Sequence, residues 1–238
     1  MPRIISLLST MLTALMLPAV VLAEGFGINA TRLIYPQAAE SISVTVRNTM
    51  ATQPYLVQAR VSGEQDGNTS APFLVRPPLF RLEPGSVNQV RILAQGVSLP
   101  ADRESVFYFH ASAIPGSTAP QPTNQQAAVS GTTQFGVGNI IKLFYRPTDL
   151  PSSSSAAQKG LQISRVKGGL LVSNPSAYYV SFASLKVGDQ ALKLDTPEAL
   201  MLAPFGSHTY ATPHTKGLVS WQTINDEGAI HDFSHNLP

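Results

Sequence analysis

The sequence contains no cysteine among its 238 residues. Disulfides are therefore excluded, and the fold has to be stabilised by burial and hydrogen bonds alone, which a chain of this length can supply as one large domain or two small ones. An excess of charge is also missing, because 16 Lys and Arg face 14 Asp and Glu. The balance provides no electrostatic footprint for nucleic acid or an anionic membrane.

Motifs of common enzyme classes are missing as well. The chain has no G-x-S-x-G, no H-E-x-x-H and no P-loop. His231 and His235 form an i, i+4 pair in "HDFSH", but they stand in a β context, where this spacing is not that of a helical metal site. We therefore expect no enzyme, no metal site and no cofactor, nucleotides such as ATP included.

A long apolar run occurs only at the start of the chain. Arg3 precedes "IISLLSTMLTALMLPAVVLA", which ends in small residues at Val21-Leu22-Ala23. This pattern predicts a secretory signal peptide over residues 1–23, cleaved after Ala23, and hence export to the periplasm. The alternative is a membrane anchor, since the run is nearly long enough to span a bilayer.

The rest of the chain is dominated by period-2 alternation, which predicts an all-β protein. The alternating segments are "SISVTV", "YLVQARV" and "QVRILA", whereas "SVFYFHASAI" is apolar on both sides in its first half and fits a central strand. Turn signals such as "GEQDGN" and "EPGS" separate them, as in a β-sandwich.

Two low-complexity segments interrupt the strands. Residues 115–133 are rich in Pro, Ser, Thr, Gln and Ala and predict a long exposed loop. Residues 148–159, with four consecutive serines, predict a linker between an N-terminal domain (24–147) and a C-terminal domain (160–238).

The segment "GNIIKLFYRP", residues 138–147, places Lys142 inside an apolar strand. The simpler interpretation is that this lysine reaches solvent or pairs with an internal carboxylate. The other is that its ammonium binds an incoming anion in a cleft, with Arg32 as a candidate second cation. Sequence alone does not bring Arg32 and Lys142 together.

Several blocks resemble one family, the PapD-like periplasmic chaperones of pilus (fimbrial) assembly. The resemblance is carried by "TRLIYP", "VTVRNT", "PYLVQA", "PFLVRPPLFRLEPG", "LPADRESVFYFHASAIP", "IKLFYRP", "LLVSNPSAYYVSFASL", "LAPFGS" and "VSWQTINDEG". These blocks run in family order through nearly the whole chain after residue 23. The resemblance implies two immunoglobulin-like β-sandwich domains arranged as an L or boomerang, with a cleft between them.

The resemblance also implies roles for particular residues. Arg32 and Lys142 match the cleft cations that anchor the C-terminal carboxylate of a pilus subunit. Thr133, Phe135 and Val137 match the alternating positions of a donor strand, here about residues 133–146, which completes the subunit's open sheet. Glu104, Arg146 and Asp226 match an ion-pair network between the domains.

The implied partners are pilus subunits, an outer-membrane usher of the chaperone–usher pathway and, for the free chaperone, a second copy of itself. The donor segment departs from the family pattern, with Gly136 and Gly138 in the strand and Ile140 where a basic residue is common. A different class remains as the alternative: a secreted β-sandwich adhesin or carbohydrate-binding module. That alternative predicts exposed aromatic platforms, but Trp221, the single tryptophan, sits in "LVSWQTI", which alternates like a core strand.

Overall fold

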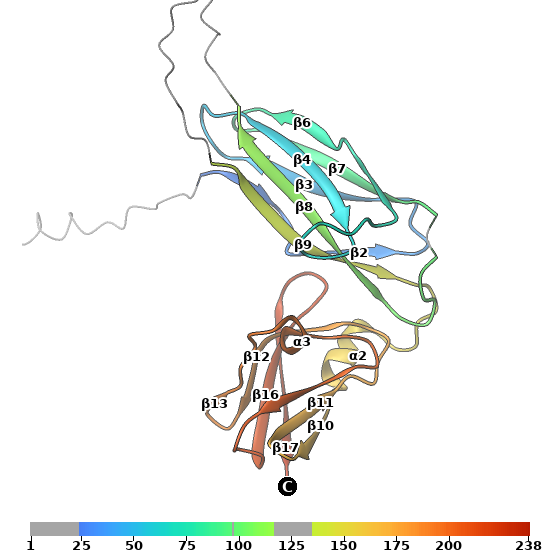
Figure 1. Cartoon of the computed structure of the whole chain (residues 1–238), viewed down its shortest axis with the longest axis vertical. Coiled ribbons are helices and arrows are strands. Elements are labelled where there is room, and N and C mark those ends of the chain that lie inside the picture. The colour runs from blue at the N-terminus through green and yellow to red at the C-terminus, as the bar shows by residue number, and fades with distance from the viewer. Residues whose placement is uncertain (1–23, 97, 117–134) are drawn as a thin grey trace, which may run out of the picture.

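The computed structural model describes residues 24–96, 98–116 and 135–238. The predicted signal peptide, Thr133 and most of the predicted loop at 115–133 lie outside these residues. The described chain consists mainly of β-strands, which form two units that follow one another along the sequence (Figure 1). The prediction of an all-β protein is confirmed.

The N-terminal unit is a two-sheet sandwich. Its strands are β1 (Phe26–Ile28), β2 (Arg32–Pro36), β3 (Ile42–Asn48), β4 (Tyr55–Ser62), β5 (Phe73–Arg76), β6 (Leu79–Leu82), β7 (Val87–Ala94), β8 (Ser105–Pro115) and β9 (Val137–Arg146). One sheet has the order β1-β3-β7-β5 and the other β2-β9-β8-β4-β6. Strands β2 and β9 run parallel, whereas the other pairs in these sheets are antiparallel.

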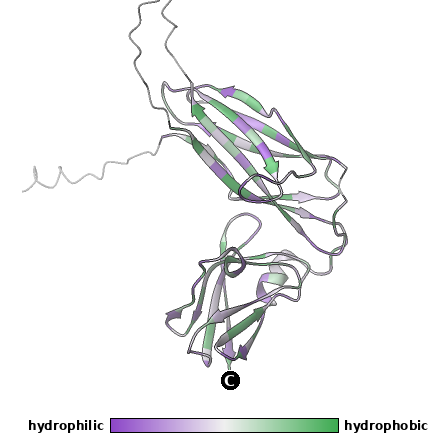
Figure 2. Cartoon of the chain, viewed as in Figure 1, coloured by the Kyte–Doolittle hydropathy of each residue, from purple (hydrophilic) through white to green (hydrophobic). Residues whose placement is uncertain are grey.

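The core of this unit follows the alternation of the sequence. Each of β3, β4 and β7 buries alternate residues, among them Val44, Val57 and Val90. Figure 2 shows hydrophilic and hydrophobic residues following one another along the strands of this unit. Strand β8 lies between β9 and β4, as its apolar first half predicted. Burying one face of each sheet against the other is what holds such a sandwich together.

The C-terminal unit is a second sandwich. Its elements are α2 (Ser154–Lys159), β10 (Gln162–Val166), β11 (Gly169–Ser173), β12 (Val180–Val187), β13 (Gln190–Ala191), α3 (Pro197–Leu200), β14 (Met201–Leu202), β15 (Ser207–Ala211), β16 (Gly217–Ile224) and β17 (Ile230–Leu237). One sheet has the order β10-β11-β15 and the other β13-β12-β16-β17, with β14 paired to β12.

The segment predicted as a linker, residues 148–159, ends in helix α2. Ser153 caps this helix, since its hydroxyl accepts a hydrogen bond from the Ala156 N–H at 3.2 Å. Ala157 and Gln158 are buried on its inner side. The serine-rich composition predicted a linker, and the cap and two buried residues order its second half as a helix.

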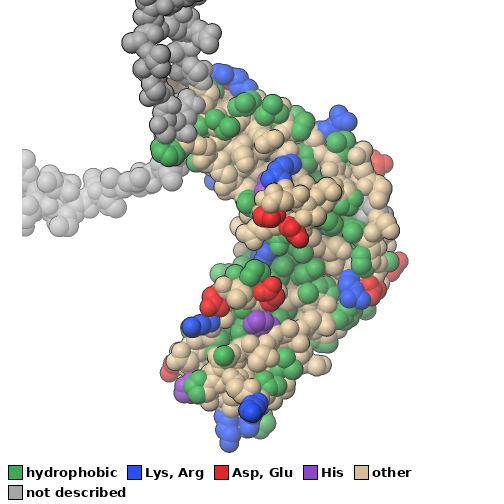
Figure 3. Space-filling model, viewed as in Figure 1, with side chains coloured by type: hydrophobic (Ala, Val, Ile, Leu, Met, Phe, Trp, Pro, Cys, Tyr) green, Lys and Arg blue, Asp and Glu red, His purple; other side chains and the backbone are tan. Residues whose placement is uncertain are grey.

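The two units are immunoglobulin-like sandwiches set at an angle, and the molecule is bent like an L (Figure 1). The space-filling view shows the concave side between them, with charged and hydrophobic side chains on both walls (Figure 3). Contacts between β9 and the β16–β17 hairpin cross the bend, as described below. The concave side is therefore a cleft lined by both domains.

Candidate functional site: the inter-domain cleft

Two cations that lie far apart in the sequence meet in the cleft. Arg32 begins β2, Lys142 lies within β9, and the parallel ladder between these strands places them directly opposite one another. Directly opposite residues project from the same face of a sheet. The pairing of β2 with β9 thus brings together Arg32 and Lys142, which the sequence alone could not show.

The guanidinium of Arg32 is partly held by the other domain. Its Nη1 donates to the carbonyl oxygen of Ile224, at the end of β16, at 2.8 Å. Its Nε is buried and has no hydrogen-bond partner in the described part of the chain. Burial lowers the pKa of Arg32, and the nearby Asp226 opposes this effect. One N–H donor of the Arg32 guanidinium is therefore unused in the described part of the chain.

Lys142 is the second uncompensated cation. No hydrogen bond or ion pair joins its ammonium to another described residue. Burial lowers the pKa of Lys142, and the charge of Arg32 beside it lowers the pKa further. Two partly buried cations at neighbouring positions repel each other unless an anion lies between them. This arrangement of two cations favours an anion between them.

Strand β9 has a free edge directly before this pair. On one side β8 pairs with β9 along its length, from Val137 to Tyr145. On the other side β2 pairs only with the second half, from Lys142 onward. Within the described residues, no strand hydrogen-bonds to the first half on that side, and β1 pairs with β3 in the other sheet. Unpaired backbone N–H and C=O groups at such an edge are a template for another strand.

The predicted donor residues flank this edge. Val137 is the first residue of β9 and 44% exposed, and Phe135, just before it, is 80% exposed. Val137 lies opposite Ala113, on the face of the sheet that turns to the core, yet the core does not cover it. Their own domain does not absorb these two side chains, so the simplest interpretation, that they merely fill its core, does not hold.

The two glycines in this stretch leave the opposite face bare. An added Cβ would meet only ordinary contacts: at Gly138 its nearest neighbour would be Ser112 Oγ at 3.6 Å, and at Gly136 the Ala113 carbonyl oxygen at 3.5 Å. Ile140, on the same face as Lys142, is half exposed. The glycines are therefore not required by crowding within the chain itself.

Arg146, Glu104 and Asp226 form one ion-pair cluster across the domains. The Arg146 Nε donates to Glu104 Oε1 at 2.7 Å, and its Nη1 and Nη2 donate to the two carboxylate oxygens of Asp226 at 2.8 and 2.9 Å. Glu104 is 3% exposed and also accepts from the Tyr179 N–H at 2.8 Å. The Ser154 hydroxyl, at the start of α2, donates to Asp226 at 2.9 Å.

The protonation states of this cluster follow from burial and partners. Burial would raise the pKa of Asp226, but the bonds from Arg146 and Ser154 outweigh it and hold this pKa below its ordinary value. Burial raises the pKa of Glu104, and Arg146 and the Tyr179 N–H counteract only part of that effect. For Arg146, burial is outweighed by the two carboxylates, which raise its pKa. The arginine is therefore permanently charged and holds the domains together.

Sequence reasoning missed several residues of this interface. Tyr179 packs on Phe144 of β9, with ring centroids 5.6 Å apart, and Arg103 lies over the ring of Phe205 at 4.9 Å. Phe205 also has a positive φ of 58°, which the sequence did not indicate. These residues come from distant loops, so no local pattern marks them.

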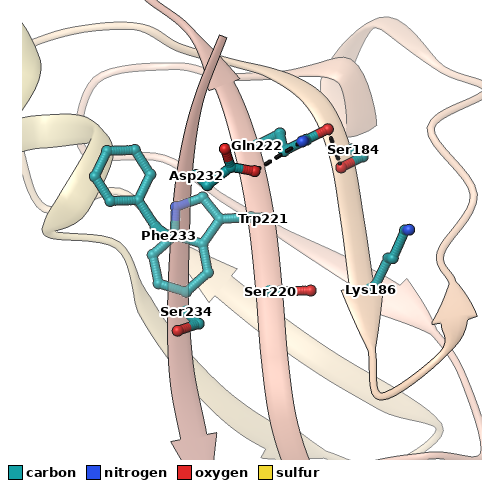
Figure 4. Close-up of a pocket in the computed structure, with 8 residues that line it drawn as sticks. All are labelled: Ser184, Lys186, Ser220, Trp221, Gln222, Asp232, Phe233 and Ser234. Carbon is teal, nitrogen blue, oxygen red and sulfur yellow. Dashed lines mark hydrogen bonds between the residues drawn. The ribbon is translucent and has the colours of Figure 1, made fainter.

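A separate hollow lies on the sheet face of the C-terminal domain (Figure 4). Its lining includes Ser184, Lys186, Ser220, Gln222 and Asp232. A hydrogen-bonded row crosses three strands here, from the Ser184 hydroxyl to Gln222 Oε1 at 2.9 Å and from Gln222 Nε2 to Asp232 at 2.7 Å. These groups satisfy one another.

Trp221 provides no aromatic platform beside this hollow. It is 3% exposed, and its Nε1 donates to the Gln158 carbonyl of α2 at 3.0 Å. The described residues thus lack, at this place, the exposed tryptophan that a carbohydrate-binding module would use.

The histidine pair noted in the sequence lies outside the cleft. His231 and His235 are exposed on β17, and His231 contacts Asn225. Across residues 24–96, 98–116 and 135–238, no group of three or more potential metal ligands gathers. Over the same ranges, no helix is both long enough and apolar enough to cross a bilayer.

Comparisons with known proteins cover nearly the whole described chain. Residues 25–151 match the family described as pili and flagellar-assembly chaperone, PapD N-terminal domain, and residues 156–235 match the pili assembly chaperone PapD, C-terminal domain. A probable fimbrial chaperone, ElfD of Escherichia coli K12, is 35% identical, with 86% of this chain and 83% of that protein covered. The chaperone FocC of Escherichia coli is 33% identical, with 87% of each covered.

Solved structures agree. The E. coli chaperone DraB superposes with a TM-score of 0.75 at 32% identity, covering 90% of this chain and 98% of that one. The SafB chaperone of Salmonella enterica, solved in complex with the SafA pilin, has a TM-score of 0.75 at 29% identity, covering 93% and 100%.

Proposed function

The chain is a pilus assembly chaperone of the PapD-like chaperone–usher family, and from that premise we propose that it captures pilus subunits by adding its strand β9 to them. A subunit whose sheet lacks a strand exposes an aggregation-prone edge and groove. Donor-strand complementation covers both, as a form of β-augmentation. The chaperone needs no nucleotide for this step, because pairing and burial supply the free energy.

The observation that carries the proposal is the position of the Arg32–Lys142 pair at the end of a free strand edge. Strand β2 occupies the edge of β9 only from Lys142 onward and runs parallel to it. A subunit strand that adds to the first half of β9 in the same direction therefore ends at these two cations. Its last group is the C-terminal carboxylate, which the cations bind.

The two parts of the site have different roles. A charge-assisted bond to the carboxylate contributes about 1.5–3 kcal/mol and fixes the register of the added strand. Phe135 and Val137, with Thr133 before them, then enter the subunit's groove, and each large side chain contributes about 1.5–3 kcal/mol when fully buried. A one-residue slip would turn these side chains to the wrong face, so the anchor protects the pairing.

The Glu104–Arg146–Asp226 cluster fixes the angle of the cleft in this proposal. Domains held at one angle keep both walls in place for the subunit. The proposal also includes the steps before and after capture. A signal peptide at residues 1–23 directs export, the chaperone acts in the periplasm, and it delivers the subunit to an outer-membrane usher. Before capture, the open edge of β9 is available to a second copy of the chain, which would cover it.

The test is purification of the chaperone from its native periplasm, with bound chains identified by mass spectrometry. We expect pilus subunits with the wild type and none with the Arg32→Ala/Lys142→Ala double variant. Arg47→Ala/Arg91→Ala, which removes two exposed cations from β3 and β7, is the matched control and should retain the subunits. If the Arg32→Ala/Lys142→Ala variant retains as many subunits as the control variant, the anchor is refuted.

A further inference from the structure

The turn of the β16–β17 hairpin is a rigid tip that reaches the other domain. The Gly228 N–H donates to the Asn225 carbonyl at 3.1 Å, and the Asn225 N–H donates to the Ala229 carbonyl at 2.9 Å. The Asn225 side chain accepts from the Ala229 N–H at 2.7 Å. In Figure 1 this tip rises from the C-terminal domain toward β2.

Three alternate residues of the tip contact the N-terminal domain. Ile224, before the turn, accepts the hydrogen bond from Arg32 Nη1, and Asp226 binds Arg146. Gly228 lies against Thr31, the residue directly before Arg32. Within the described residues, the only hydrogen bond that the Arg32 guanidinium donates therefore goes to the hairpin tip that also makes the other two contacts.

Two features favour glycine at position 228. Its φ is +87°, a conformation that residues with a side chain rarely adopt. A Cβ at this position would also overlap Thr31 Oγ1, whereas the Thr31 Cβ and Cγ2 would remain 3.6 Å away. Gly217, at the other end of β16, has φ +91° but nothing within 4 Å of an added Cβ. The chain thus offers a control glycine with the same backbone strain and no contact.

We propose that Gly228 is a positioning residue for the carboxylate anchor: the close fit of the hairpin tip on Thr31 sets the Ile224 carbonyl, which aims the Arg32 guanidinium at the incoming chain end. This inference rests on the proposed function and names the device that makes its anchor depend on the domain angle. Arg32 is then correctly oriented only when the C-terminal domain is docked.

The probe is a synthetic peptide of alternating valine and threonine, made with a free C-terminal carboxylate and as the C-terminal amide. Wild type should prefer the free acid by about tenfold or more, the ratio expected for one charge-assisted bond. Gly228→Ala should reduce this preference to about twofold or less, and Gly217→Ala should leave it unchanged. Because both glycines have a similar positive φ, a difference between the two variants reports mainly the Thr31 contact.

A second readout follows Arg32 directly. In wild type, the hydrogen bond to Ile224 should slow rotation of the guanidinium, so its NMR signals should be resolved. Gly228→Ala should merge them, and the second-site change Thr31→Ala should restore them, since it removes the oxygen that the new Cβ meets. If Gly228→Ala does not fold, Thr31→Val, which presses on the tip from the other side, should reduce the acid preference in the same direction.

The outcomes separate the two proposals. If Arg32→Ala keeps the preference for the free acid, the carboxylate anchor itself is wrong. If Arg32→Ala loses the preference but Gly228→Ala and Thr31→Val retain it, the anchor stands and the positioning role of Gly228 is overturned. In the Arg32→Ala background, Gly228→Ala should change peptide binding no further; an additional loss there also overturns the inference.

Discussion

Lys142 is a residue whose charge costs stability in the free protein. It is partly buried beside Arg32 without a carboxylate, and both conditions lower its pKa. Replacing a destabilising functional residue with one that suits its surroundings commonly raises stability by about 0.5–2 kcal/mol. Lys142→Met should therefore raise the free energy of unfolding by that amount while subunit capture is lost.

Denaturant unfolding and periplasmic co-purification measure the two effects of Lys142→Met. The matched control is Lys186→Met, on the exposed face of β12, which should leave both quantities unchanged. A Lys142→Met variant that is less stable than wild type would contradict the view that the charge is uncompensated before capture.

The lowered pKa of Lys142 also predicts how capture depends on pH. A lysine whose pKa is lowered loses its proton on the alkaline side earlier than an ordinary lysine, and the neutral amine no longer attracts a carboxylate. Capture should therefore weaken as the pH rises from neutral through this lowered pKa. Lys142→Arg, which stays charged, should keep capture level over the same range if the carboxylate is held by charge.

The measurement for this pH dependence is dissociation of the purified chaperone–subunit complex at a series of pH values. A wild-type complex that dissociates no faster at alkaline pH than the Lys142→Arg complex would show that the lysine charge is not needed. Unfolding of the free chaperone over the same range, followed by circular dichroism, is the control.

At the residue scale, the sequence made only part of the site predictable. Lys142 stood out because a cation inside an apolar strand is unusual, and Arg32 was a candidate for the second cation. The family resemblance added the carboxylate role of both residues and the ion-pair residues. Their meeting depends on a parallel pairing that no local pattern contains. Gly228 and Tyr179 were missed because their importance lies in contacts with the other domain.

At the scale of elements, β9 is divided into two halves with different tasks. Its second half is paired on both sides and anchors the strand, whereas its first half has one free edge. Phe135→Ser/Val137→Thr should weaken subunit retention by about tenfold or more, since both side chains are exposed in the free chaperone and buried on capture. Stability should change by no more than about 0.5 kcal/mol, as for other surface positions.

The control for the donor-strand variant is Val87→Thr, an exposed valine on β7 of the other sheet. Retention is measured by the half-life of the purified complex in the presence of a competing chaperone. Unchanged retention in Phe135→Ser/Val137→Thr would mean that these side chains do not enter the subunit.

The sequence predicted the strands better than it predicted the short helix α2. Period-2 alternation identified β3, β4 and β7 because each buries one face. Helix α2 was missed because runs of serine favour flexible segments. Its stability depends on the Ser153 cap and on burial of Ala157 and Gln158, which are properties of the folded domain.

At the scale of the whole molecule, Arg146 forms ion pairs with carboxylates of both domains. Arg146 bridges Glu104 of one domain and Asp226 of the other, and Glu104 is almost fully buried. Removing one partner of a buried ion pair leaves an uncompensated charge and typically costs about 3–5 kcal/mol. Arg146→Met should lower stability by roughly that amount and widen the distribution of inter-domain distances.

Electron–electron distance measurements between spin labels on β6 and β13 would detect the wider distribution in Arg146→Met. Arg103→Met, which removes an exposed ion pair with Asp102 and the contact with Phe205, is the control and should keep the wild-type distances. A narrow distribution in Arg146→Met would show that the cleft angle is set by other contacts.

The central claim is that the first half of β9 becomes a paired strand when a subunit is captured. Hydrogen exchange of the β9 backbone amides, compared between free chaperone and chaperone–subunit complex, tests it most directly. The account predicts new protection at alternate amides within residues 137–141, those whose N–H groups point to the free edge, and little change at 142–146, which β2 and β8 already pair. Protection that appears elsewhere and leaves residues 137–141 unchanged would contradict strand addition at this edge.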